Sequence, residues 1–245
     1  MIVTVPLVAA PVHLPTRVGT HLARAGTDAV HLLDAVASLI VDPPTLGGWL
    51  RSLIDDPRSA SPIAKESYWH VNGFAKLVLH SEPSHRVRLH VWPEGPGPRG
   101  ETDPHSHRWD FASAVVAGPG LLVTEFQEGR PGLPIVRYRY TGGATRNSLS
   151  CDGDASLREV SRREIGTFDT YATDIRAVHT VGPLSSAMTA TLVVQGPHRT
   201  DSTRVYRVAG APDESRSEPL DELDVRLLLA EVIAAIPDGK GVPGR

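Results

Sequence analysis

The stretch Arg86-Val87-Arg88-Leu89-His90-Val91-Trp92 alternates strictly between polar and apolar side chains up to its final tryptophan. Successive side chains of a β-strand point to opposite faces of the sheet. The two arginines and the histidine would therefore share one face, and the two valines and the leucine the other. The stretch is predicted to be a strand, and it lies near the start of a long run of strand-like sequence.

Short apolar segments with strand-like sequence, most of them separated by glycine and proline, lie on both sides of the stretch. Further strands are predicted at residues 75–80, 111–117, 121–126, 135–140, 157–160, 167–171, 177–180, 187–195 and 203–209. Many short strands at regular spacing are typical of an all-β sandwich or barrel.

Helical periodicity appears only toward the two ends of the chain. Apolar residues recur at helical spacing over 20–41, a second helix is expected at 46–55 and a third starts near 61, while 219–236 is expected to be a C-terminal helix beginning at Pro219. We therefore divide the chain into an irregular arm (1–15) with helices packed on the barrel (1–74), the barrel itself (75–209), and a linker with the C-terminal helix (210–245).

Composition excludes several classes of protein. The chain has 245 residues, a formal net charge of −3 and one cysteine, Cys151. Nucleic-acid binders are normally basic, and a disulfide framework or multi-cysteine zinc ribbon needs more than one cysteine. The N-terminus lacks the basic leader of a signal peptide, and no stretch has the ~20 apolar residues of a spanning helix. We expect a cytoplasmic protein with no nucleic-acid or membrane partner, and a homodimer stays open.

A His-x-His pair, His105 and His107, follows a Gly/Pro-rich run at 95–100. On an extended segment both imidazoles point to the same side, and two neutral imidazoles suit a divalent metal ion. His179 lies on a predicted strand and is the candidate third ligand. The alternatives are a solvated loop for the pair and a hydrogen-bonded core histidine for His179.

This arrangement resembles the cupin superfamily over roughly residues 75–208. Cupins have a glycine, a His-x-His pair, a glutamate and a glycine in a first motif, and one more histidine in a second. The run at 91–97, Val-Trp-Pro-Glu-Gly-Pro-Gly, and the segments 178–183 and 190–197 look like thiol dioxygenases of the cysteine dioxygenase type. The resemblance implies a mainly β fold, a cupin-type antiparallel barrel (jelly roll) with N-terminal helices and a C-terminal helix.

Three departures from the family pattern bear on the substrate. Phe111 and Ala112 stand where a cupin normally has its metal-binding glutamate, as in the three-histidine thiol dioxygenases. The cysteine that forms the cross-link in that family would fall at Ala112, where this chain has an alanine. The arginine that binds the substrate carboxylate in that family would fall near Asn72, where this chain has no arginine. The resemblance therefore implies a relative that keeps the metal chemistry and has a different substrate.

The implied cofactor is Fe(2+), held by His105, His107 and His179. Three neutral ligands leave a ferrous ion its full charge and open positions for substrate and O2. The favoured function is a mononuclear non-haem iron oxygenase acting on a small polar or amino-acid-like substrate. One alternative is an isomerase, lyase or decarboxylase using another divalent metal, such as zinc, nickel or manganese. The other is a non-enzymatic small-molecule-binding cupin.

Three residues are candidates for substrate binding. If the polar face of 86–92 lines the barrel, Arg88 could bind a substrate carboxylate through two hydrogen bonds, and His90 could bond to substrate or to a ligand histidine. The alternative places that face in solvent. Trp109 flanks the histidine pair, where it either packs in the core or lines the pocket.

Three further residues are candidates for catalysis. Tyr138 and Tyr140 alternate with two arginines, and we expect the tyrosines inside the barrel, where a phenol near iron could act as acid or hydrogen-bond donor. Asp110 is expected to hold Arg108 or a ligand histidine by a hydrogen bond rather than to bind the metal itself.

Overall fold

The computed structural model describes residues 14–96, 99–142, 147–208 and 217–237. Residues 1–13 of the expected arm lie outside this part of the chain, and residues 14 and 15 belong to the first helix. The described helices are α1 (Leu14–Ala25), α2 (Ala29–Ile40), α3 (Pro43–Asp55), α4 (Ala60–Glu66) and α5 (Glu222–Ala235). The described strands are β1 (Tyr68–His70), β2 (Phe74–Glu82), β3 (His85–Trp92), β4 (Phe111–Ala117), β5 (Leu121–Gly142), β6 (Asn147–Ile165), β7 (Thr170–Thr173), β8 (Val178–Pro183), β9 (Thr189–Gln195), β10 (Thr203–Arg207) and β11 (Glu218–Pro219).

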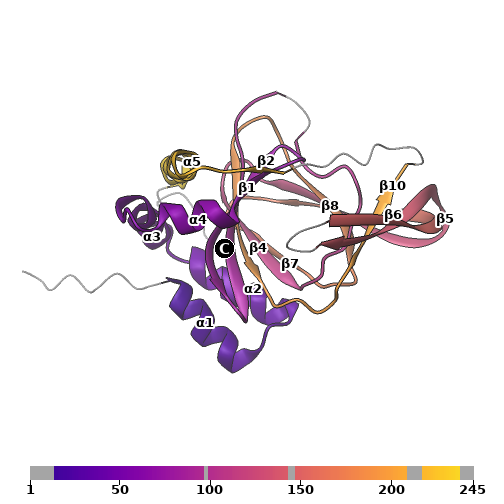
Figure 1. The fold of residues 1–245 in the computed structure, drawn as a ribbon, viewed down its shortest axis with the longest axis horizontal. Helices are drawn as coiled ribbons and strands as arrows, with labels where there is room; N and C mark the ends of the chain where they lie inside the picture. Colours follow the sequence, from indigo (N-terminus) through magenta and orange to yellow (C-terminus); the bar gives the residue numbers. More distant parts are fainter. Residues whose placement is uncertain (1–13, 97–98, 143–146, 209–216, 238–245) are drawn as a thin grey trace, which may run out of the picture.

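The strands form two antiparallel sheets. The larger sheet has the order β11-β1-β2-β3-β9-β4-β7, and in the smaller sheet β5 pairs with β6 along one edge and with β8 and then β10 along the other. Helices gather on one side of these sheets (Figure 1). The predicted mainly β fold with N-terminal helices and a C-terminal helix is confirmed.

Two details of the helix prediction are wrong. The single helix expected at 20–41 is two helices, because Gly26 adopts a φ of 111° and Asp28 caps the start of α2 by accepting the backbone N–H of His31. The C-terminal helix starts at Glu222, since Asp221 is its N-cap and Pro219 belongs to β11. None of the described helices could span a membrane alone; only α2 and α3 together, bent by 86°, have the required length and composition.

The β3 strand separates the core from the interior between the sheets. Val87, Leu89 and Val91 are fully buried and pack in one cluster with residues of α2, including Leu32 and Val36. The alternating side chains on the other face of the strand point away from the helices, toward a cavity between the two sheets. The polar face of 86–92 therefore does line the interior, apart from Arg86 near its outer end.

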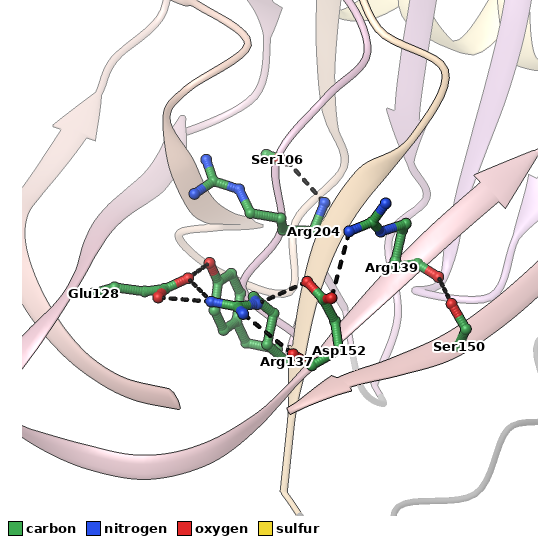
Figure 2. Close-up of polar contacts among 8 residues, drawn as sticks. Ser106, Glu128, Arg137, Arg139, Ser150, Asp152 and Arg204 are labelled. Carbon is green, nitrogen blue, oxygen red and sulfur yellow. Dashed lines mark hydrogen bonds and ion pairs between the residues drawn. The ribbon is translucent and has the colours of Figure 1, made fainter. Parts of the chain in front are cut away.

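The segments predicted as strands at 121–126 and 135–140 are parts of one long strand, β5, which forms a hairpin with β6 that projects from the body (Figure 1). A polar network joins this hairpin to β10 (Figure 2). Arg137 donates to Asp152 Oδ2 at 3.0 Å and to Glu128 Oε2 at 2.9 Å, and the Tyr206 hydroxyl donates to Glu128. The network therefore connects the outer half of the β5–β6 hairpin to β10, which pairs with the same edge of β5 as the histidine-bearing β8.

Candidate metal centre

The three predicted metal ligands come together. One nitrogen of each ring, in His105, His107 and His179, lies within 4.8 Å of the other two. The segment that carries the His-x-His pair is held against β8, because the backbone groups of His105 and His179 exchange two hydrogen bonds of 3.0 Å. The imidazoles of His105 and His107, on one extended segment, therefore face the imidazole of His179 on β8, and the His-x-His spacing predicts that the first two share a side.

The ring nitrogens are arranged as metal ligands require. His105 Nδ1 lies 3.0 Å from the carbonyl oxygen of Asp103, so this nitrogen donates and Nε2 presents its lone pair to the cluster. Burial holds the pKa of His107 well below its usual range and lowers the pKa of His179 to about 3, so both rings are neutral at physiological pH. Their Nε2 atoms lie 2.9 Å apart, close to the separation of about 3.0 Å between adjacent ligands of an octahedral ion with bonds of about 2.1 Å. The three donors fit a divalent metal ion.

Glu101 is a member of this site that the sequence reasoning missed. Its Oε1 lies 3.4 Å from His105 Nε2, and its Oε2 accepts the backbone N–H of Val181 on β8. The preceding residue, Gly100, makes the approach possible, because a Cβ there would lie 2.5 Å from the Cα of Gly182. A carboxylate four residues before the histidine pair does not follow the cupin pattern, in which the glutamate comes after it.

Two cavities meet at the histidines. The inner cavity lies between the sheets and includes Arg88, His90 and His179 in its wall. The outer cavity, of about 410 Å³, lies toward the surface and includes His105 in its wall. Lys76, Glu101, His107 and Trp109 line both cavities. The outer cavity falls within the size range of small-molecule sites, which is roughly 300–1,000 Å³.

All three residues predicted to bind substrate line the inner cavity. Arg88 is 8% exposed, and its guanidinium carbon lies 5.3 Å from the centre of the Trp109 ring, a cation–π distance. Burial lowers the pKa of Arg88 to about 10, which leaves it charged at pH 7. Burial also holds the pKa of His90 well below its usual range, so this ring is neutral. Lys76, which was not predicted, adds a second cation to the same wall.

The residues predicted as catalytic are dispersed. Tyr140 lines the outer cavity, whereas among the described residues Tyr138 lines neither cavity. Asp110 has partners that were not expected. Its carboxylate accepts the backbone N–H of Ile175 at 2.9 Å and pairs with Arg199 at 2.6 Å. The reason is strand alternation, since the flanking Trp109 and Phe111 face the cavity and Asp110 points the other way.

No protein-family model and no curated protein sequence matches this chain. Among solved structures, a cupin domain from Bordetella pertussis is 13% identical over 51% of this chain and 93% of its own, with a TM-score of 0.30. A sugar phosphate isomerase of the cupin superfamily from Silicibacter pomeroyi is 15% identical over 60% and 76% of the two chains, with a TM-score of 0.33. A nucleoside dehydratase from Streptomyces is 13% identical over 60% and 90%, also with a TM-score of 0.33. Likeness at this level carries no argument about the fold or the activity of this chain.

Proposed function

We propose that this chain is a cupin-type metalloenzyme that holds a divalent metal ion, ferrous iron in the first instance, with His105, His107 and His179, and that oxidises a small anionic substrate of the amino-acid or carboxylate kind. The observation that carries the substrate class is the environment of Arg88. Its Nε is buried and has no hydrogen-bond partner among the described residues.

A buried guanidinium is costly unless an anion accompanies it. In the described part of the chain no acidic side chain forms an ion pair with Arg88. The polar side chains that line the same cavity include the neutral His90, the cationic Lys76 and the acidic Glu101. Together with Glu101, a carboxylate or another small monoanion bound beside Arg88 and Lys76 would balance the two positive charges. The planar guanidinium favours a carboxylate, which it can bind through two parallel hydrogen bonds.

In this reaction the chain would position the substrate and exclude water from it. The three imidazoles would hold a metal ion at the junction of the two cavities, and a ferrous ion there would supply open positions at which substrate and O2 can be activated together. Arg88 anchors the anionic end of the substrate on the inner side. Trp109, stacked against Arg88 and against His198 at a ring separation of 5.0 Å, restricts access of water to the anchored group.

Glu101 favours a second candidate function. A carboxylate 3.4 Å from a ligand nitrogen and exposed to both cavities is in a position to take a proton from a bound substrate. With a metal acting as a Lewis acid, that arrangement suits an isomerase or lyase that consumes no O2.

Metal analysis of protein purified without chelator tests the proposal. We expect about one iron per chain at this site and, after nitric oxide is added to the reduced protein, the electron paramagnetic resonance signal of a ferrous–nitrosyl complex. Oxygen uptake in the presence of small carboxylates then identifies an oxygenase. Turnover of such a substrate under nitrogen would instead establish the isomerase or lyase, and a protein that retains no divalent metal would contradict both.

A further inference from the structure

A second group of metal-ligating side chains lies at the tip of the β2–β3 hairpin. His80 Nε2 is 3.0 Å from Glu82 Oε1, and His85 Nδ1 is 3.9 Å from Glu82 Oε2. One ligand atom from each of the three residues lies within 4.8 Å of the other two. The three side chains offer two imidazole nitrogens and one carboxylate.

A β-bulge brings these residues to one face. The register of β2 on β3 shifts between Val78 and His80, so that His80 pairs with Val87, and Glu82 lies directly opposite His85. Val87 faces the helices, so the residues that share its side of the sheet after the bulge face them as well. Without the shift, His80 and Glu82 would lie on the same face of β2 as Phe74 and Lys76. They would then point away from the helices, toward the cavity side of the sheet.

The group is therefore separate from the metal centre described above. Lys76, on the same strand before the bulge, lines the cavities that contain His107, whereas His85 faces away from them on the opposite face of the sheet. Helix α1 passes over the group at Gly19, where a Cβ would lie 3.4 Å from His85 Cε1 and 3.5 Å from Glu82 Oε2.

The three side chains lie near the spacing of metal ligands. Ligands of a tetrahedral ion with bonds of 2.0–2.1 Å lie about 3.4 Å apart. His80 Nε2 lies 3.0 Å from one carboxylate oxygen of Glu82, and His85 Nδ1 lies 3.9 Å from the other, so the side chains must draw together for one ion to be shared. The His85 side chain is fully buried, and Nδ1 is the ring nitrogen that faces Glu82. Nδ1 would therefore be the ligand, and Nε2, which has no hydrogen-bond partner in the described part of the chain, would carry the ring proton. Ser84 Oγ lies 3.1 Å from His85 Nδ1 and is the contact that an ion at this nitrogen would displace.

We propose that His80, Glu82 and His85 form a second site for a divalent metal ion, with zinc as the ion that two imidazoles and one carboxylate suit best. Three protein ligands leave a fourth position for water. Because Glu82 and His80 are partly exposed, the ion can enter from solution. A bound ion would connect the end of β2 to the start of β3 beneath α1. It would stabilise the folded chain by a free energy that rises with the logarithm of the free zinc concentration above the Kd.

Zinc titration of the metal-free full chain, by calorimetry and by metal analysis after desalting, tests the site. We expect two equivalents in the wild type, one in His107→Ala, one in Glu82→Gln, and none in the double variant. Glu82→Gln is the preferred substitution because its side chain is exposed and nearly isosteric, and circular dichroism verifies the fold. His31→Ala is the matched control, since His31 also lies 2.9 Å from a carboxylate, that of Asp28, but belongs to no three-residue group among the described residues.

The outcomes separate this site from the proposed function. One equivalent in the wild type that is lost in His107→Ala and kept in Glu82→Gln overturns the second site and leaves the three-histidine centre in place. One equivalent that is lost in Glu82→Gln and kept in His107→Ala supports the second site and removes the first. An equal loss in His31→Ala identifies the second equivalent as unspecific binding to surface histidines and overturns the proposal.

Discussion

His107 Nε2 and His179 Nε2 lie 2.9 Å apart, although 72 residues separate the two histidines in the chain. Neutral imidazoles at this distance share one hydrogen bond at most, and His105 presents a further lone pair to the same point. Three convergent nitrogen donors gain far more from a cation than from one another. Substitution of one of these histidines is therefore the change with the clearest expected effect, which is the loss of metal binding.

His107→Ala should abolish iron binding while the chain stays folded, because the apolar cores form without the metal. In the wild type, removing the metal with a chelator should lower the melting temperature, since an ion at 100 times its Kd stabilises the folded state by about 2.7 kcal/mol. Iron analysis and thermal unfolding measure both effects. His198→Ala serves as the control, because His198 stacks on Trp109 outside the ligand set; stoichiometric iron in His107→Ala would contradict the ligand assignment.

Arg88→Met should stabilise the substrate-free chain, by about 1 kcal/mol or more, because it removes a buried charge that has no acidic partner among the described residues. Urea unfolding measures the change. Arg88→Lys should raise KM for the substrate by roughly 10- to 150-fold, which corresponds to about 1.5–3 kcal/mol of charged hydrogen bonding, with a smaller effect on kcat. Iron content unchanged in both variants separates anion binding from metal binding, whereas a destabilised Arg88→Met would show that the guanidinium is already paired.

Glu101→Gln distinguishes the two candidate reactions. The amide oxygen can still accept the N–H of Val181, so the fold should persist, and loss of the negative charge beside His105 should weaken metal affinity by about 10- to 100-fold. If Glu101 moves a proton in an isomerase or lyase, kcat should fall by a further factor of about 10²–10⁴ at saturating metal. An oxygenase should keep most of its kcat once the metal is restored. Unaltered metal affinity and kcat would show that Glu101 only supports the backbone of β8.

Asp110→Asn should lower the free energy of unfolding by about 1.5–3 kcal/mol without loss of metal, because a buried carboxylate loses its charged hydrogen bond to Arg199. Glu159→Gln provides the comparison. Glu159 pairs with Arg162 on the surface, where such a pair contributes about 0–1 kcal/mol. Urea unfolding compares the two variants, and a drop in iron affinity in Asp110→Asn would instead connect Asp110 to the histidines.

Prediction from the sequence succeeded where local pattern carries the information. Strict alternation placed β3, and the spacing of His105 and His107 put their imidazoles on one side. It was less reliable where a single backbone feature decides the outcome. Gly26 broke one expected helix into two. The bulge in β2 turned His80 and Glu82 toward the helix side, a direction that was not predicted from the sequence. Neither effect alters the hydrophobic periodicity from which the strands and helices were predicted.

The sequence by itself determined the mainly β class, the helical ends and the identity of the three histidine donors, since these follow from periodicity and from the chemistry of side chains at fixed spacing. Tertiary structure alone decided which face of β3 looks inward, that Glu101 lies beside His105, and that Asp110 pairs with Arg199. The reason is physical. Alternation shows that two faces differ, whereas only the packing of helices against one face, and the pairing of strands distant in the chain, determines what each side chain meets.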